Sequence, residues 1–347
     1  MERPIDLRRD TITLPTEAMK QFAFQAELGD SIYGEDPMQR KLEELGASIL
    51  GKERAIFLPS GTMGNLVALL THTRRGEEVI LEESAHIFTS ETGGVGAIAG
   101  LTVKPIRGED GAPSPAAILQ AIRPDNIHYP RTRLICLENT HYRYGGIVPP
   151  LEKFRAIREL ATEKGLSIHL DGARLFNAAV YLGVEVQVIA QYADTVMVSL
   201  SKGLGAPVGS LLAGPRDFIK EAERYRKMLG GGMRQTGWLC ACGIMALSPE
   251  NIARLREDHE NARFLAEGLC AIPGIKVDCT RVHTNFVLAD LAESGWDARQ
   301  FVERLKEKGV LATPAGESKV RFVTSKEVNR TQIALALERI HELMRAR

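Results

Sequence analysis

The run ADTVMVSLSKGLGAPVGSLLAG, residues 193–214, decides the fold of this chain. Its residue pattern predicts an apolar strand, a Ser-Lys step, a glycine-rich turn and a second apolar strand. Burial between two apolar runs disfavours the ammonium form of a lysine and lowers the pKa of its amine. Lys202 is therefore a candidate for Schiff-base chemistry, which needs a neutral amine. A solvated loop lysine is the alternative, and the neighbouring strands have to decide between the two.

Short apolar runs alternate with amphipathic windows from residue 53 to about residue 215, which is typical of an α/β fold. The expected strands are 55–58, 78–81, 134–137, 167–170, 196–198 and 210–213, and the expected helices between them are 64–71, 115–122 and 151–164. This alternation predicts a mostly parallel sheet covered by helices on both faces. Ligands bind such sheets outside the carboxyl ends of the strands, so the polar residues that close each strand are the candidate site residues.

The two ends of the chain add further elements. Helices are expected at 16–27, capped by Thr16, at 38–50, and across 216–247 with a break at three glycines, 230–232. After the Ser248-Pro249 step the expected order is helix 249–270, strand 275–279, strand 284–290, helix 297–308, strand 319–324 and helix 329–345. The sequence thus predicts a large domain over residues 1–248 and a smaller α+β domain over residues 249–347.

Composition excludes several classes of function. Lysine plus arginine and aspartate plus glutamate number 44 each, so no net field attracts nucleic acid or an anionic membrane. No apolar run approaches the roughly 18 residues of a membrane span. The five cysteines form neither a disulfide framework nor a zinc site, and we expect a cytoplasmic protein without a metal that binds a small molecule.

Two neighbouring strand ends carry complementary charges. Asp171 closes the strand at 167–170, and Arg174 follows where a helix should begin. A capping aspartate with an incidental arginine is the alternative. Lys202 closes the next strand, one helical crossover later, which should bring Asp171 and Lys202 together at one edge of the sheet.

Two more strand ends belong to the same edge. Ser60-Gly61-Thr62 opens a helix, where unpaired N–H groups and the helix dipole could hold a phosphate, although the same letters also suit a plain helix cap. His86 follows the strand at 78–81 and could stack on a planar ring or move a proton, although a lone histidine can also be structural. His128 precedes its strand and is a further candidate.

These parts match the needs of pyridoxal phosphate. That cofactor requires an amine for its Schiff base, a carboxylate at its pyridine nitrogen, a cup for its phosphate and a ring to stack on it. Lys202, Asp171, the 60–62 turn and His86 would supply them in that order.

Several motifs together resemble the low-specificity L-threonine aldolases. The most specific are DGARLFNA at 171–178, SLSKGLGAPVG at 199–209 and RKMLGGGMRQ at 226–235. The likeness also includes YGEDP at 33–37, SGTMGN at 60–65, IHYPRTR at 127–133 and RFVT at 321–324, so that it spans nearly the whole chain in order.

The resemblance implies a fold-type I pyridoxal phosphate-dependent enzyme. It implies retro-aldol cleavage of L-threonine, L-allo-threonine and other β-hydroxy-α-amino acids into glycine and an aldehyde, reversibly, by a homotetramer built of dimers. The resemblance also implies the roles of the site residues. Lys202 would form the Schiff base, Asp171 would contact the pyridine nitrogen, and His86 would stack on the ring. Arg174 would contact the cofactor and, with Arg321, bind the substrate carboxylate, whereas Lys227 and Arg234 would reach a neighbouring subunit's phosphate and Tyr33 would lie at the shared site. His86, with His128 as second candidate, would be the base.

One position departs from the family. The usual Leu-Arg-Ser-Asp-Thr is Leu7-Arg8-Arg9-Asp10-Thr11 here, which puts Arg9 where a serine commonly helps to bind the carboxylate. A β-eliminating lyase or an amino acid racemase on the same fold is the nearest alternative function. A pyridoxal-binding protein without catalysis, acting through protein contacts, is the alternative from another class.

Overall fold

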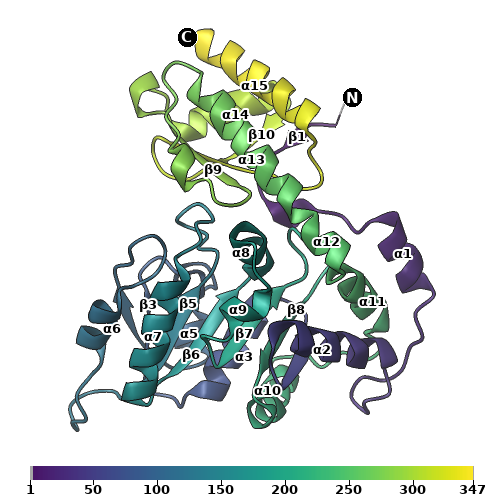
Figure 1. Ribbon diagram of the computed structural model, residues 1–347, viewed down its shortest axis with the longest axis vertical. Coiled ribbons are helices and arrows are strands. Elements are labelled where there is room, and N and C mark those ends of the chain that lie inside the picture. Colours follow the sequence, from purple (N-terminus) through teal and green to yellow (C-terminus); the bar gives the residue numbers. More distant parts are fainter. Residues whose placement is uncertain (1–2, 347) are drawn as a thin grey trace.

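A seven-stranded sheet forms the centre of the lower part of the molecule in this computed structural model, which describes residues 3–346 (Figure 1). Its order is β2-β8-β7-β6-β5-β3-β4, and β8 alone runs against its neighbours in this sheet. The strands are β2 (Arg54–Leu58), β3 (Glu78–Glu82), β4 (Thr102–Ile106), β5 (Thr132–Glu138), β6 (Ser167–Gly172), β7 (Thr195–Ser199) and β8 (Ser210–Gly214). The predicted α/β class is confirmed.

All six predicted strands of this sheet are present, and β4 was missed. Its residues TVKPI are exposed or half-buried and include a lysine and a proline, so they lack the apolar signal of a central strand. β4 lies at the edge of the sheet, paired in parallel with β3 alone.

Helices cover both faces of the sheet. Apolar side chains of α2 (Pro37–Leu50), α7 (Leu151–Lys164), α8 (Leu175–Leu182), α9 (Val186–Ala190) and α11 (Gly237–Ala246) share one core with the sheet. α3 (Gly61–His72) and α10 (Arg216–Met228) pack against strand residues in two smaller clusters. α7 has the predicted bounds, because Gly165 ends it in the left-handed conformation at φ 65°.

The C-terminal part has its own core and its own antiparallel sheet, β11 (Thr313–Pro314), β12 (Lys319–Val323) and β9 (Phe286–Asp290). α13 (Leu255–Cys270), α14 (Ala298–Glu307) and α15 (Arg330–Arg345) pack on it, in the upper part of Figure 1. β1 (Ile5–Asp6) pairs in parallel with β10 (Val310–Leu311), so the beginning of the chain joins this part. The boundary between residues 248 and 249 stays a prediction.

Two expectations for this part were wrong. Residues 275–279 form no strand: Lys276 makes an isolated bridge to Asp290, and Cys279–Arg281 is a short 3-10 helix, η2. The expected helix 249–270 is two helices, α12 (Pro249–Ala253) and α13, which meet at Arg254. The remaining elements are η1 (Asp10–Ile12), α1 (Glu17–Phe24), α4 (His86–Thr89), α5 (Gly94–Ala97), α6 (Pro115–Ala121) and η3 (Ala292–Ser294).

None of the helices formed within residues 3–346 combines the length and the apolar character that a membrane crossing requires.

Candidate functional site

Two adjoining cavities lie at the sheet edge where the carboxyl ends of β2, β3, β5, β6 and β7 meet. The Asp171 chamber, about 320 Å³, is lined by residues 59–62 and by Asn65, His86, Glu91, Asp171 and Lys202, among others. The arginine chamber, about 390 Å³, is lined by Arg9, Tyr142, Arg143, Arg174 and Arg321. His86 and Lys202 line both chambers, so the predicted lysine stands where the two meet.

The loop after β7 holds Lys202 in place. The carbonyl of Lys202 accepts hydrogen bonds from Thr13 Oγ1 at 2.7 Å and from the backbone N–H of Gly205 at 2.8 Å. Gly205 has φ 77°, a conformation that suits glycine. Burial, aided by the charge of Arg174, lowers the pKa of Lys202 to about 8. At pH 7 about a tenth of this amine is thus neutral, far more than for a lysine at its ordinary pKa, and imine formation requires the neutral form.

Asp171 is fixed at the end of β6 with 2% of its surface exposed. Its Oδ2 accepts a hydrogen bond from Asn65 Nδ2 at 2.8 Å, and its Oδ1 accepts one from the backbone N–H of Ala173 at 3.0 Å. β6 and β7 are neighbours in the sheet, which confirms the adjacency expected from the crossover spacing. Two donors therefore hold the carboxylate in place.

A buried chain of side chains orients Asn65. His169 Nε2 lies 3.1 Å from Asn65 Oδ1, and His169 Nδ1 lies 2.9 Å from Thr195 Oγ1. Burial lowers the pKa of His169 to about 4, so its ring is neutral near pH 7. With Asn65 Oδ1 accepting from this ring, the amide nitrogen is left to donate to Asp171 and to Glu91.

His86 begins α4 and pairs with Glu91 across 2.8 Å at Nδ1. Burial alone would lower the pKa of His86, but the hydrogen bond with Glu91 and the nearby Asp171 raise it overall. Ligand atoms of His86, Glu91 and Asp171 lie within 4.8 Å of one another, a spacing that could suit a metal ion. Asn65 already donates to both carboxylates, so we assign the group to the chamber wall.

The predicted anion cup is the N-terminus of α3. Ser60 caps this helix, with its Oγ accepting from the backbone N–H of Met63 at 3.2 Å. Gly61 and Thr62 form the first turn, where backbone N–H groups have no partner within the helix. A Cβ on Gly64 would come within 2.7 Å of Met197, so glycine is needed for α3 to lie this close to β7.

The arginine chamber collects guanidinium groups from distant segments. Arg174 binds Asp10 with two hydrogen bonds, Nε to Oδ2 at 2.6 Å and Nη2 to Oδ1 at 2.7 Å. Arg321 comes from β12, and its Cζ lies 4.3 Å from the centre of the Tyr142 ring. Arg321 is 5% exposed, and its Nε is buried without a hydrogen-bond partner among the described residues. Such an orphaned donor suits an anionic ligand.

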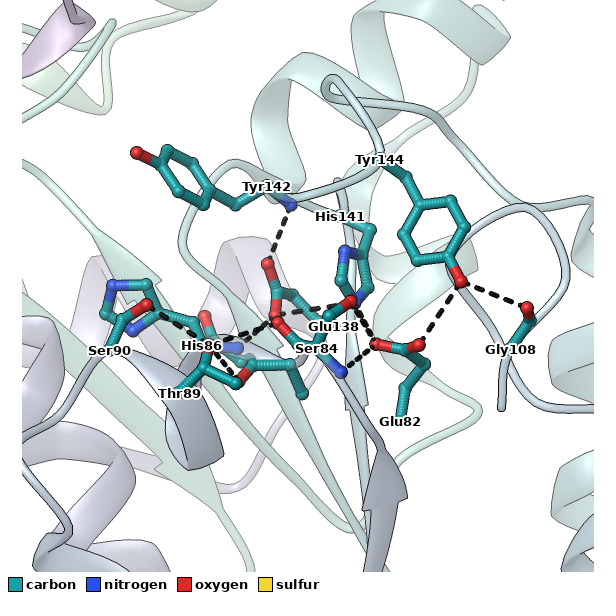
Figure 2. Close-up of polar contacts among 12 residues, drawn as sticks. Glu82, Ser84, His86, Thr89, Ser90, Gly108, Glu138, His141, Tyr142 and Tyr144 are labelled. Carbon is teal, nitrogen blue, oxygen red and sulfur yellow. Dashed lines mark hydrogen bonds and ion pairs between the residues drawn. The ribbon is translucent and has the colours of Figure 1, made fainter. Parts of the chain in front are cut away.

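Glu138 lines neither chamber but binds the backbone of two residues that do, His86 and Tyr142 (Figure 2). Its Oε2 accepts from the backbone N–H of His86 at 2.7 Å, and its Oε1 accepts from that of Tyr142 at 2.8 Å. Behind it, His141 Nε2 lies 3.1 Å from Glu82 Oε2 and 3.8 Å from Glu138 Oε2. Burial opposes the charge on His141, but Glu138 and Glu82 raise its pKa overall. The two carboxylates therefore favour the protonated form of His141, which in that form would hold them together.

Four predicted site residues do not line either chamber of this chain. Tyr33 is 78% exposed, Arg234 pairs with Asp30 at 3.4 Å, and Lys227 lies on the exposed side of α10. His128 is exposed in the loop that leads into β5, at the amino end of that strand and hence at the opposite edge of the sheet. Their roles would need a second copy of the chain.

The sequence reasoning missed several residues. Asn65 ends the SGTMGN motif and His169 lies in the predicted strand 167–170, but the sequence does not distinguish side chains that orient a site from a helix cap or a core residue. Tyr142 follows the β5 end by four positions, beyond the strand-end rule that identified His86 and Asp171. Asp10 was found only as the neighbour of Arg9, because its partner Arg174 is 164 residues away.

Comparisons with known proteins agree with this geometry. The model of the beta-eliminating lyase family matches residues 6–294. The low specificity L-threonine aldolase of Escherichia coli (strain K12) is 46% identical over 333 residues, which cover 95% of this chain and 96% of that protein.

Solved structures share the whole architecture. A Leishmania major threonine aldolase superposes with a TM-score of 0.85 at 23% identity, covering 98% of this chain and all, 100%, of the other. A structure described as SPT with PLP superposes with a TM-score of 0.75 at 21% identity, covering 99% and 88%. At these identities the likeness concerns the fold, and the predicted fold-type I architecture is confirmed.

Proposed function

The chain belongs to the beta-eliminating lyase family, and we propose that it is a pyridoxal phosphate-dependent aldolase that cleaves L-threonine, L-allo-threonine and other β-hydroxy-α-amino acids into glycine and an aldehyde. One observation carries the proposal: Lys202, with the pKa of its amine lowered, stands between a chamber built on a fixed carboxylate and a chamber built on arginines. A carbonyl cofactor would occupy the first chamber and the amino acid substrate the second, and the two must adjoin for them to react.

The residues of the Asp171 chamber fit pyridoxal phosphate. Lys202 would hold its carbonyl carbon, Asp171 its pyridine nitrogen, and Ser60, Gly61 and Thr62 its phosphate at the start of α3. When bound, this cofactor accepts the electron pair released at the substrate Cα. Asp171, which is 2% exposed, would support that role by placing its carboxylate group at the ring nitrogen.

The arginine chamber would bind the substrate carboxylate. Asp10 occupies Nε and Nη2 of Arg174 and so fixes the side chain with Nη1 left for the substrate. Arg321 supplies the orphaned Nε, and Arg9 lines the same chamber. Arg174 and Arg321 would hold the carboxylate in one orientation, and that orientation would select which bond at Cα is broken.

His86 would take the proton of the β-hydroxyl group. Glu91 engages Nδ1, which leaves Nε2 as the acceptor, directly or through a water molecule. Once the ring is charged, Glu91 stabilises it, as the raised pKa of His86 indicates. His128 is the second candidate and would have to come from another subunit.

A shared active site explains the residues that lie outside both chambers. We propose a homotetramer built of dimers, in which Lys227 and Arg234 reach the phosphate of a neighbouring subunit and Tyr33 lies at the shared site. Exposed apolar side chains support an interface near them: Phe24 is 80% and Met228 is 73% exposed. Cytoplasmic localisation is part of the proposal, supported by five free cysteines.

Mixing two inactive variants tests the shared site. Lys202→Ala destroys the lysine of every site, and Arg234→Ala destroys the phosphate contact that each subunit lends to its neighbour. If subunits share sites, hybrid oligomers of the two variants contain some intact sites and regain activity. No regain on mixing after subunit exchange, verified by mass, contradicts sharing.

Product analysis tests the reaction. The purified protein, loaded with pyridoxal phosphate, is incubated with each of the four threonine stereoisomers. The proposal predicts equal amounts of glycine and acetaldehyde from L-threonine or L-allo-threonine. An oxo acid with ammonia would identify an eliminating lyase instead, and exchange of enantiomers would identify a racemase. A protein that binds the cofactor without any turnover would be a non-catalytic binding protein.

A further inference from the structure

The arginine chamber holds more positive charge than one substrate carboxylate requires. Four arginines line it, Arg9, Arg143, Arg174 and Arg321, and no acidic side chain from residues 3–346 does. Asp10, behind the wall, neutralises Arg174 through its two hydrogen bonds. Arg9 and Arg143 are exposed, and neither forms an ion pair with a carboxylate in the described part of the chain.

One aromatic ring gathers three of these cations. The Cζ atoms of Arg143, Arg174 and Arg321 lie 5.8, 5.7 and 4.3 Å from the centre of the Tyr142 ring. A guanidinium within about 6 Å of a ring is attracted to its face. Tyr142 thus offsets part of the repulsion among like charges. Its backbone N–H is held by Glu138, so the ring is anchored to the sheet edge.

Arg9 adds to the same field. Burial lowers the pKa of Arg321; the neighbouring Tyr142 opposes this shift, and the charges of Arg9 and Arg174 add to it. Clustering cations in this way is unfavourable until an anion joins them. The substrate α-carboxylate brings one negative charge, whereas Arg9, Arg143 and Arg321 bring three positive charges beyond the Arg174–Asp10 pair. The chamber is therefore suited to a dianionic ligand.

We propose that this enzyme prefers β-hydroxy-α-amino acids whose side chain ends in a second acidic group, and that Arg9 and Arg143 bind that group. The inference rests on the proposed aldolase function. The simplest such substrate is 3-hydroxyaspartate. Its β-hydroxyl group gives up a proton, the Cα–Cβ bond breaks with its electron pair staying on Cα, and Cα takes up a proton. Glycine and glyoxylate result, and together they contain every atom of the substrate.

Kinetics of the holoenzyme test the preference. We expect kcat/KM for L-3-hydroxyaspartate, in its better diastereomer, to exceed that for L-threonine by about tenfold or more. Arg9→Gln and Arg143→Gln should each remove about tenfold of that ratio. Lys319→Gln is the matched control, because it removes one exposed charge from the strand of Arg321 but outside the chamber. An equal or lower value for hydroxyaspartate with threonine well cleaved overturns the inference and leaves the aldolase function standing.

Binding gives a readout without turnover. L-Aspartate and L-2-aminobutyrate both lack the β-hydroxyl group and differ in the second acidic group. Calorimetric titration of the holoenzyme should show L-aspartate binding about tenfold more tightly, with the advantage lost in Arg9→Gln. O-Phospho-L-serine distinguishes a phosphate-binding subsite from a carboxylate-binding one. Equal affinity for 2-aminobutyrate and both acidic amino acids overturns the inference, whatever reaction the protein catalyses.

Discussion

The Asp171 chamber and the arginine chamber share two residues but differ in how their charges are satisfied. Each carboxylate of the Asp171 chamber already has a donor: Asn65 and the Ala173 backbone serve Asp171, and Asn65 and His86 serve Glu91. In the arginine chamber only Arg174 has a carboxylate partner among the described residues. The hydrogen bonds fix the carboxylates of the Asp171 chamber in place, whereas the guanidinium groups of the arginine chamber that lack a carboxylate partner are suited to bind an incoming anion.

The two chambers also differ in origin. The Asp171 chamber comes from consecutive strand ends of one sheet, within residues 59–208. The arginine chamber draws on residues 9–11, on the loop after β5 and on β11 and β12 of the C-terminal part. A change in how the C-terminal part sits would move Arg321 but would leave Asp171 where it is. If the two chambers hold the substrate and the cofactor as proposed, such a change would affect substrate binding more than cofactor binding.

Removing the lysine that both chambers share should have the largest effect. Lys202→Ala should lower kcat for glycine formation at least about a thousandfold, because no other lysine from residues 3–346 lines the Asp171 chamber. The visible absorbance of the loaded protein should disappear with it. An unchanged midpoint of thermal unfolding, measured without cofactor, serves as the control for folding. Activity within tenfold of the unsubstituted protein would remove Lys202 from the mechanism.

Substituting Glu138 should lower activity less than substituting Lys202. Glu138→Gln keeps the shape of the side chain but replaces one acceptor oxygen with a donor that faces the backbone N–H of His86 or Tyr142. We expect kcat to fall about tenfold and the free energy of unfolding to fall by about 1–3 kcal/mol. Steady-state kinetics and urea unfolding measure the two effects.

Glu83→Gln is the matched control for that substitution, since Glu83 is exposed next to Glu82. Restored kinetics in Glu138→Asp with its stability still lowered would separate positioning from folding. If Glu138→Gln and Glu83→Gln behave alike in kcat, Glu138 does not position the site.

Replacing His169, which lies behind the Asp171 chamber, should have the smallest effect, and this effect is a change in how stability depends on pH. Burial lowers the pKa of His169 from 6.5 to about 4. Below pH 6.5 the unfolded chain therefore binds a proton that the folded protein excludes, so stability falls as the pH drops from 6.5 towards 4. Between about pH 7 and about pH 5 the unfolding midpoint should fall about 3 °C further in the unsubstituted protein than in His169→Gln. The same fall in both would show that His169 is not the source.

Sequence reasoning reached the Asp171 chamber well because that chamber follows from local rules. Alternation of apolar runs located β6 and β7, and parallel strands place their closing residues, Asp171 and Lys202, at one edge. The same rule located His86 and the cap at Ser60. These rules act over a few residues or one crossover, and over that range the sequence pattern predicts the local structure.

The arginine chamber was found only in part, because long-range packing builds it. Arg174 stands in a strand-end motif, and family resemblance supplied Arg321. The partners that define their chemistry, Asp10 and Tyr142, lie on irregular segments whose positions depend on how the two parts of the chain pack. The edge strand β4 and the short β1 were missed for a related reason, since pairing with a neighbour, and not an apolar pattern, makes them strands.

The claim that the Asp171 chamber binds the cofactor and the arginine chamber binds the substrate is tested most directly by comparing Asp171→Asn with Arg321→Gln on L-threonine. We expect Asp171→Asn to lower kcat about a hundredfold and to weaken cofactor binding, while KM changes less than about threefold. We expect Arg321→Gln to raise KM about a hundredfold while the absorbance of the bound cofactor is retained. Cofactor titration and steady-state kinetics on both variants measure this. If both substitutions shift the same parameter, the two chambers do not divide cofactor binding from substrate binding.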